Sequence, residues 1–376
     1  MNRFIQIHLL TSYPPSNLNR DDLGRPKTAI MGGANRLRIS SQSLKRAWRT
    51  SDVFQEKLTD NIGKRTKEIP QKLIIDLFNN QLEPEQIKVW SNDMSFVFGD
   101  IDETDEEIKH SQLVHISPLE QKILKDYIMN IISIIKNGEK NDNIQEIIDL
   151  QKKRKEKNKA DDKKKITNQI KKKLSEQLLA KTSACTDIAM FGRMLAGNQE
   201  YNVEAAVQVA HAITVHKVAV ENDYFTALDD LNKLGAAHLG DTEFGAGLFY
   251  LYICIDKELL LENLNSDKEL TKKTLSALME ACTTVSPTGK QNSFASRARA
   301  MFCLVEKGNQ QPRSLHTAFL KPIEGKDVLS DSISNLKAMK ENFTKVYGQC
   351  SESEHSFDVL KGEGSFANIL SFVQED

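Results

Sequence analysis

The sequence lacks the features of membrane and exported proteins. None of its 376 residues belongs to an apolar run of about 18, the length that a membrane-spanning helix needs, so we expect no membrane partner. The N-terminal segment MNRFIQIHLL has neither a long apolar stretch nor a small-residue cleavage site, so we expect no signal peptide. The five cysteines are scattered without a Cys-x-x-Cys pair, which indicates reduced thiols. These absences predict a cytoplasmic protein.

The common catalytic and cofactor motifs are also missing. The chain contains no P-loop, no Gly-x-Ser-x-Gly sequence and no dinucleotide-binding glycine pattern, so we expect no cofactor. His211 and His216 do not have the i, i+4 spacing of a zinc-binding helix, and no third ligand stands near them. We therefore expect no metal site.

A few residues keep an enzymatic alternative open. Asp21 and Asp22 suggest a metal-dependent nuclease, but adjacent carboxylates diverge in most backbones. His8 and His238 have the chemistry of an acid and a base for RNA cleavage. Structural histidines are the simpler interpretation, and an endoribonuclease using His8, His238 or Asp22 stays as the alternative function.

Negative charge is absent from one stretch. The net charge of the chain is −1, yet Leu23–Ser51 contains no Asp or Glu. The cations of this stretch are Arg25, Lys27, Arg36, Arg38, Lys45, Arg46 and Arg49. A basic segment in a nearly neutral chain predicts a localised anion-binding face, provided that the segment folds into one surface.

Part of this segment is predicted to be helical. The Ser40-Ser41 pair is expected to cap a helix that extends past Trp48. Cations near a helix N-terminus are disfavoured by roughly 0.3–1 kcal/mol each. Lys45, Arg46 and Arg49 therefore need either acids from elsewhere in the fold or an external anion. A phosphate would be bound by backbone N–H groups, serine hydroxyls and these cations together.

Hydrophobic periodicity predicts an α+β fold. Strands are expected at Arg3–Leu10, Leu37–Ile39, Cys185–Phe191, 207–215, Phe249–Ile255 and Ala300–Val305. Helices are expected from Ser117-Pro118 to Gly138 and at Asn143–Leu179, Ser266–Thr284 and Asp327–Tyr347. The alanines within 207–215 leave a helix as the alternative there. Strands around a helical block at 60–180 predict an open, ferredoxin-like sheet with an inserted helical domain.

A second basic run lies in the helical block, from Lys152 to Lys173. Two interpretations stay open: a solvated helix surface, or a non-specific contact with DNA.

Several motifs together resemble a known family. The segments Leu18–Asp22, Gly32-Gly33 and Arg38–Ala47 (RISSQSLKRA) resemble the N-terminal signature of the CasC family, the repeated backbone subunits of the type I-E CRISPR Cascade complex. Further blocks follow in the family's order: Gly192–Met194, Ala210–Thr214 with His216, Phe225–Ala227 with Asp229-Asp230, and Ala237–Gly240. The resemblance extends to about residue 255, and beyond it the chain matches only in type.

The resemblance implies a hand-like fold. A palm of the RNA-recognition-motif type would comprise residues 1–59 and 181–376, helical fingers residues 60–180, and a thumb loop residues 218–247. The palm would bind guide-RNA phosphates through Arg20, Lys27, Arg38, Ser40, Gln42, Lys45, Arg46 and Arg49. Met194 and Phe225 would form a wedge beside a kinked base, although core packing is the alternative role for both side chains.

The implied function is non-catalytic binding of a CRISPR guide RNA. Phosphate contacts carry affinity without sequence information, which suits a protein that accepts any guide. The implied partners are the guide RNA, target DNA, other copies of the chain, other Cascade subunits and a recruited or fused nuclease.

Overall fold

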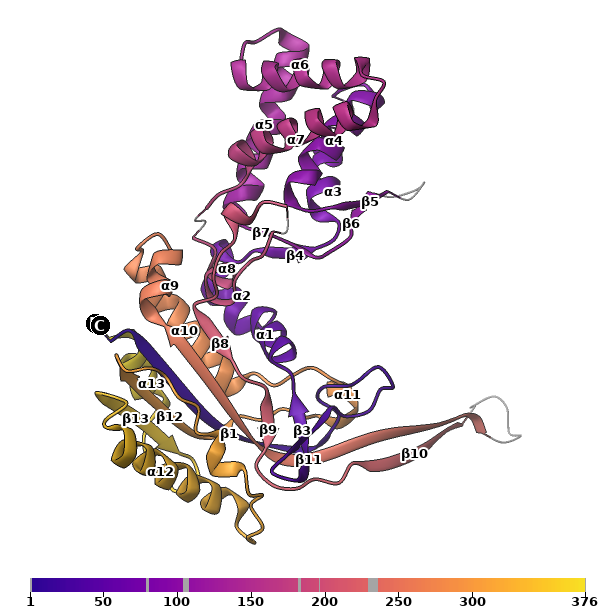
Figure 1. Ribbon diagram of the computed structural model, residues 1–376. Helices are drawn as coiled ribbons and strands as arrows, with labels where there is room; N and C mark the ends of the chain where they lie inside the picture. Colours follow the sequence, from indigo (N-terminus) through magenta and orange to yellow (C-terminus); the bar gives the residue numbers. More distant parts are fainter. Residues whose placement is uncertain are drawn as a thin grey trace. The chain divides into compact units, whose positions relative to one another are not determined.

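The structure is a computed structural model that describes residues 2–78, 81–103, 108–181, 184–195, 197–228 and 236–375. The chain divides into two compact units (Figure 1). The sheet unit comprises Met1–Thr59, Ala206–Leu261 and Lys268–Asp376. The helical unit comprises Asp60–Ala205 and Glu262–Asp267. The sequence placed the end of the helical insertion at residue 180, whereas the helical unit continues to Ala205.

A large antiparallel sheet forms the centre of the sheet unit. Its strands follow the order β13-β12-β1-β11-β9-β3-β2, and β8 and β10 also pair with β11. The strands are β1 (Phe4–Ser16), β2 (Thr28–Met31), β3 (Ala34–Ile39), β8 (Val207–Val209), β9 (Ala212–Thr214), β10 (Glu221–Leu228), β11 (Ala236–Asp256), β12 (Ala300–Gly308) and β13 (Ser353–Asp358). The predicted α+β class is confirmed in this coarse form.

Strand β1 organises the sheet. It pairs with β11 on one side and β12 on the other, so that Ile7 lies opposite both Ile253 and Val305. All residues from Phe4 to Leu10 are buried, which requires both faces of the strand to be covered. The alternating apolar residues that predicted this strand lie on one of its faces. The buried polar residue His8 lies on the opposite face.

Helices cover the two faces of the sheet. On one face, Leu10 and Phe302 pack in a core with Ile333 and Leu336 of α12. Helix α10 contacts β12 from the other side, and α1, α2 and α13 pack against α10 (Figure 1). The helices of this unit are α1 (Ser41–Arg49), α2 (Asp52–Leu58), α10 (Lys268–Thr284), α11 (Gln291–Phe294), η3 (His316–Phe319), α12 (Val328–Tyr347) and α13 (Phe366–Gln374).

The helical unit has its own core. Its helices are α3 (Ile69–Phe78), α4 (Pro84–Phe98), α5 (Pro118–Asn137), α6 (Asp142–Glu156), α7 (Ala160–Leu178), α8 (Thr186–Phe191) and η2 (Gln199–Tyr201). Two small sheets pair β4 (Lys64–Thr66) with β7 (Val114–Ile116) and β5 (Ile101–Glu103) with β6 (Ile108–His110). Two short helices, η1 (Thr59–Asn61) and α9 (Lys257–Asn263), contain residues of both units. Buried residues of α4, α5 and α7, among them Trp90, Ile128 and Leu174, pack in one cluster.

The helix predicted from Ser117-Pro118 to Gly138 is confirmed as α5. The Ser117 hydroxyl accepts the Glu120 N–H, and the Glu120 carboxylate accepts the Ser117 N–H, which completes a capping box. Gly138 ends the helix with a left-handed φ of 71°. Residues close together in the sequence therefore cap both ends of this helix.

Two sequence predictions in the helical unit were wrong. Cys185–Phe191 was predicted as a strand, but Thr186–Phe191 forms helix α8. A short apolar run does not distinguish a buried strand from a buried helix. Asn143–Leu179 was predicted as one helix, but the chain is extended at Lys157 and Lys159. Helices α6 and α7 pack against each other, and Lys173 forms an ion pair with Glu146 at 2.6 Å.

Candidate nucleic-acid interface

The basic segment of the sheet unit forms strands β2 and β3 and helix α1. Ser40 caps α1, since its hydroxyl accepts the Ser43 N–H at 3.3 Å. The Ser40 N–H itself donates to Asn19 Oδ1 at 2.8 Å. Leu44 and Trp48 are buried on one side of the helix. The loop that contains Asn19 is thus tied to the start of α1.

The predicted helix is confirmed and is short, which changes the electrostatic argument. It has nine residues and ends at Arg49, so Arg46 and Arg49 lie in its last turn. Cations in a last turn are favoured by the helix dipole, not opposed by it. The need for a compensating anion that we derived for these two residues was therefore wrong. For Lys45, burial lowers the pKa of the side chain.

The polar residues of α1 form two stripes. Ser43 and Arg46, together with Thr50 at the C-cap, follow one side of the helix. Gln42, Lys45 and Arg49 have the same spacing on an adjacent side, roughly 100° further round. The first stripe lines a groove that the second does not line, so the structure separates residues that the sequence had grouped.

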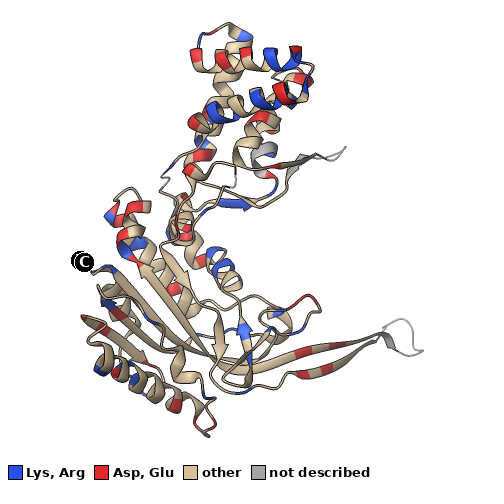
Figure 2. Cartoon of the chain, viewed as in Figure 1, with Lys and Arg blue, Asp and Glu red and all other residues tan. Residues whose placement is uncertain are grey.

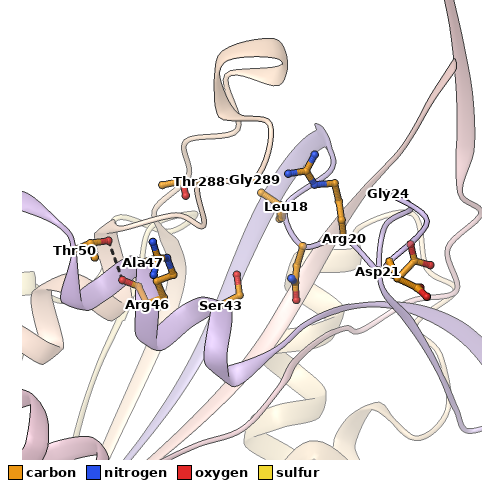
Figure 3. Close-up of a pocket in the computed structure, with 12 residues that line it drawn as sticks. Leu18, Arg20, Asp21, Gly24, Ser43, Arg46, Ala47, Thr50, Thr288 and Gly289 are labelled. Atoms are coloured by element: carbon orange, nitrogen blue, oxygen red, sulfur yellow. Dashed lines mark hydrogen bonds between the residues drawn. The ribbon is translucent and has the colours of Figure 1, made fainter. Parts of the chain in front are cut away.

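The groove lies between α1 and two loops (Figure 3). It has a volume of about 490 Å³ and is lined by Leu18, Asn19, Arg20, Asp21, Asp22, Gly24, Ser43, Arg46, Ala47, Thr50, Thr288 and Gly289. Arg20 and Arg46 stand on opposite sides of it in Figure 3, and both are exposed. Neither forms an ion pair within the described part of the chain. Two guanidinium groups are therefore available to one anionic ligand.

Two carboxylates also line the groove. Asp21 Oδ1 accepts the backbone N–H groups of Leu23 and Arg25, at 3.0 and 2.9 Å. Oδ1 of this carboxylate therefore shapes the turn of the loop. Asp22 is exposed on the same loop. The suggested pairing of the two as nuclease ligands gains no support from this arrangement.

The far wall of the groove was not predicted. Gly289 lies so close to the N-terminal loop that an added Cβ would be 2.3 Å from the carbonyl oxygen of Leu18. The loop that contains Gly289 is also joined to β11, because Lys290 Nζ donates to Thr242 Oγ1 at 3.0 Å. The sequence signal for it is the small pair Thr288-Gly289, which is common in turns and does not indicate a binding site.

Lys27 and Arg38 lie beside the groove, around the same asparagine. The Lys27 N–H donates to the Asn19 carbonyl at 2.8 Å, and the Arg38 N–H donates to the Lys27 carbonyl at 2.8 Å. Arg38 Nη1 lies 2.8 Å from His211 Nδ1, between β8 and β9. Burial lowers the pKa of His211, and the charges of Arg38 and Lys27 lower it further. Sequence reasoning did not place His211 on this face.

The remaining cation of β3 has another role. Arg36 is fully buried and donates to the carbonyl oxygens of Thr214 and Phe319, both at 3.0 Å. It connects β3 to β9 and to η3. The basic segment therefore supplies both a structural cation and surface cations.

The two predicted wedge residues are both on the surface. Met194 belongs to the helical unit and is 76% exposed, while Phe225 belongs to the sheet unit and is 42% exposed. Phe225 lies on the ribbon formed by β10 and the first part of β11, opposite Gly240. A Cβ on Gly240 would be 2.6 Å from the Phe225 ring, so the ring lies across this glycine. The core-packing alternative is wrong for both side chains.

Arg193, next to Met194 in the resemblance, is structural. Its guanidinium donates to both carboxylate oxygens of Glu120, at 2.7 and 2.8 Å, and both side chains are buried. Because Glu120 also accepts from the Ser117 cap, this pair joins α5 to the segment after α8.

The catalytic candidates have contrasting environments. His8 is fully buried, with Nδ1 at 2.8 Å from the Tyr250 hydroxyl and Nε2 at 3.1 Å from Glu306. It is out of reach of any RNA. The side chain of His238 lies outside the described residues. His216 forms hydrogen bonds through Nδ1 with the Lys217 carbonyl and through Nε2 with the Leu248 N–H.

The described residues also bear on metal binding and membrane insertion. None of their His, Cys, Asp and Glu side chains gather in a group of three that could hold a metal ion. In the same part of the chain, every helix is too short or too polar to cross a membrane.

The chain is similar to known proteins over nearly its whole length. The family model described as CT1975-like protein matches residues 5–369. A chain of the solved structure "CRISPR RNA-guided surveillance complex, pre-nicking" is 26% identical, covers 99% of both chains and has a TM-score of 0.78. A chain of another, "CRISPR RNA-guided surveillance complex", is 22% identical over 99% of both chains with a TM-score of 0.68, which shows a shared fold. No curated protein matches significantly.

The family match covers nearly the whole chain, including the C-terminal third where the sequence motifs were weak. The resemblance that the motifs predicted is thereby confirmed at the level of the family. The chain belongs to the CT1975-like protein family.

Proposed function

We propose that this chain is a non-catalytic RNA-binding backbone subunit of a CRISPR surveillance complex. The observation that carries the proposal is the gathering of Arg20, Lys27, Arg38 and Arg46 around Asn19 on one face of the sheet unit. Arg20, Lys27 and Arg46 form no ion pair among the described residues, so an RNA phosphate can supply their counter-charge. The 26% identity to a chain of an RNA-guided complex supports the same role.

The proposed mode of binding is through phosphates. Two arginines facing one groove suit consecutive phosphates of a single strand, and such contacts ignore base identity. Ser40, Gln42, Lys45 and Arg49 would extend the contact along α1. Met194 and Phe225 would each pack against a base of the guide where it is kinked. The palm of the RNA-recognition-motif type, the fingers and the thumb are the parts that this proposal assigns to the chain.

The proposed assembly is a type I-E Cascade. Several copies of the chain would line up along one guide RNA in the cytoplasm and present it to target DNA. Other Cascade subunits and a recruited or fused nuclease would complete the complex. Sequence recognition would come from base pairing with the guide, and the protein would supply backbone contacts only. The exposed lysines of α6 and α7 are available for non-specific contact with DNA.

The alternative is an endoribonuclease that processes guide-precursor RNA. It would have to act without His8, because that side chain is fully buried. Asp22 and His238 would remain as its candidates. The two functions differ in whether the RNA survives binding.

Salt dependence tests the proposal directly. We expect Arg20→Ala combined with Arg46→Ala to weaken binding of unrelated single-stranded RNAs to the same extent. Each lost phosphate contact should reduce the slope of log K against log salt by about 0.7. The measurement is fluorescence anisotropy of labelled RNAs over a range of salt concentrations, with the full chain.

Lys361→Ala is the matched control, since Lys361 is an exposed cation of the sheet unit outside the groove. It should leave both affinity and slope unchanged. A loss in the double variant that depends on RNA sequence, or an unchanged slope, would contradict phosphate binding in the groove.

A further inference from the structure

The contact between Arg38 and His211 determines the protonation state of the histidine. A guanidinium only donates hydrogen bonds, so His211 Nδ1, 2.8 Å from Arg38 Nη1, is the acceptor. The proton of the neutral ring therefore sits on Nε2. An imidazolium could not accept this bond, and it would place a third positive charge beside Arg38 and Lys27.

The surroundings favour the same state. Arg38 of β3 and Lys27, in the loop before β2, are the charged groups that act on His211, and both lower its pKa together with burial. The histidine itself is placed by β11, because the Ala210 N–H donates to the Tyr252 carbonyl at 2.9 Å. A neutral acceptor therefore stands at a defined position next to the guanidinium.

We propose that His211 is a positioning residue of the nucleic-acid face, whose neutral imidazole holds the Arg38 guanidinium in place for an RNA phosphate. This inference rests on the proposed function of the face. Arg38 has several rotatable bonds, and ordering them before binding reduces the entropy lost when the phosphate is bound.

A double-mutant cycle tests the inference. At about pH 8, above the ordinary histidine pKa of roughly 6.5, the ring is neutral. We expect His211→Ala to weaken the binding of a synthetic single-stranded RNA about three- to tenfold, the range for loss of one hydrogen bond. In an Arg38→Ala background the same substitution should have no effect, because nothing is left to position.

His211→Asn is the conservative variant, since its Oδ1 can accept at the position of Nδ1. It should retain most of the wild-type affinity. His211→Gln extends further and should not restore it. As pH falls through the lowered pKa of His211, the coupling between His211 and Arg38 should disappear, whereas the coupling of Arg38 to the amide of the His211→Asn variant should persist.

The outcomes separate this inference from the proposed function. If the wild-type chain does not bind RNA, the proposed function fails. If it binds RNA and Arg38→Ala weakens binding, but His211→Ala is neutral, the positioning role alone is overturned. Independent effects of the two substitutions, or an Asn variant as weak as the Ala variant, would overturn it too. Circular dichroism of each variant checks that the fold is intact.

Discussion

At the scale of single residues, one basic segment serves two purposes. Arg36 and Arg38 are two positions apart on β3, so composition and alternation treat them alike. Arg36 is buried and donates to two backbone carbonyls, whereas Arg38 is partly exposed and hydrogen-bonded to His211. The neighbours contributed by distant segments, not the residue type, decide which arginine is structural and which can meet a ligand.

The buried group around His8 leads to a prediction for acid stability. His8 bonds to Glu306, and Arg313 donates to both Glu306 oxygens at 2.7 and 2.9 Å. Burial lowers the pKa of His8, while the bonds from His8 and Arg313, outweighing burial, lower that of Glu306 to about 2.

Both shifts act in the same direction. A group whose pKa is lower in the folded state binds more protons when unfolded, so its stabilising contribution is lost as pH falls. We expect the free energy of unfolding to decrease below about pH 6.5, and more steeply from about pH 4.5 towards pH 2. Urea titrations across this range measure it. In Glu306→Gln the steep part should be reduced, and an unchanged acid profile would refute this assignment.

At the scale of elements, helix α1 and the β10–β11 ribbon carry the proposed contacts. Helix geometry divides the polar residues of α1 into two stripes, of which one lines the groove. The ribbon pairs Glu221 with Phe244 at its base and continues into the main sheet as β11. Because β11 is one continuous strand, the ribbon is anchored by the hydrogen bonds that pair β11 with β1 in the main sheet. Acidic residues along the ribbon are visible in Figure 2, so its proposed contact with RNA is with a base and not with phosphates.

The ribbon offers an internal control for the wedge. Phe225 and Tyr224 are adjacent on β10, so their side chains point to opposite faces. We expect Phe225→Ala to change the pattern of base reactivity along a bound guide, because the ring that packs against the kinked base is lost. Tyr224→Ala, which removes an exposed ring from the other face, should change it less.

Chemical probing of guide RNA in the assembled complex measures this pattern. Thermal unfolding should show both variants folded, since Phe225 is partly exposed and lies over a glycine. Equal effects of the two substitutions, or no effect of either, would argue against Phe225 as the wedge.

The elements also show how far the sequence alone can lead. The strand at Phe4–Leu10 and both ends of α5 were predictable, because alternation, a serine cap and a terminal glycine act locally. Helix α8 was missed, since its short apolar run fits a strand equally well. The cations of the groove were found through their sequence, but its far wall at Thr288-Gly289 was not. That wall comes from a loop more than two hundred residues away, which no local pattern reveals.

At the scale of the whole molecule, the proposed phosphate contacts all belong to one unit. The sheet unit contains Arg20, Lys27, Arg38, the α1 residues and Phe225, whereas Met194 belongs to the helical unit. A subunit that binds a phosphate backbone without reading bases should accept any stretch of RNA long enough to fill its face. Repeated binding along one strand is therefore the central claim about the intact chain.

The mass of the protein–RNA complex tests this claim most directly. The full chain would be mixed with synthetic RNAs of graded length, and the complexes measured by light scattering after size exclusion, with the RNA recovered and sized. We predict that the mass rises in steps of one protein for each fixed increment of RNA, and that the RNA is recovered intact. One protein on every RNA, whatever its length, or RNA recovered in discrete fragments, would contradict the account.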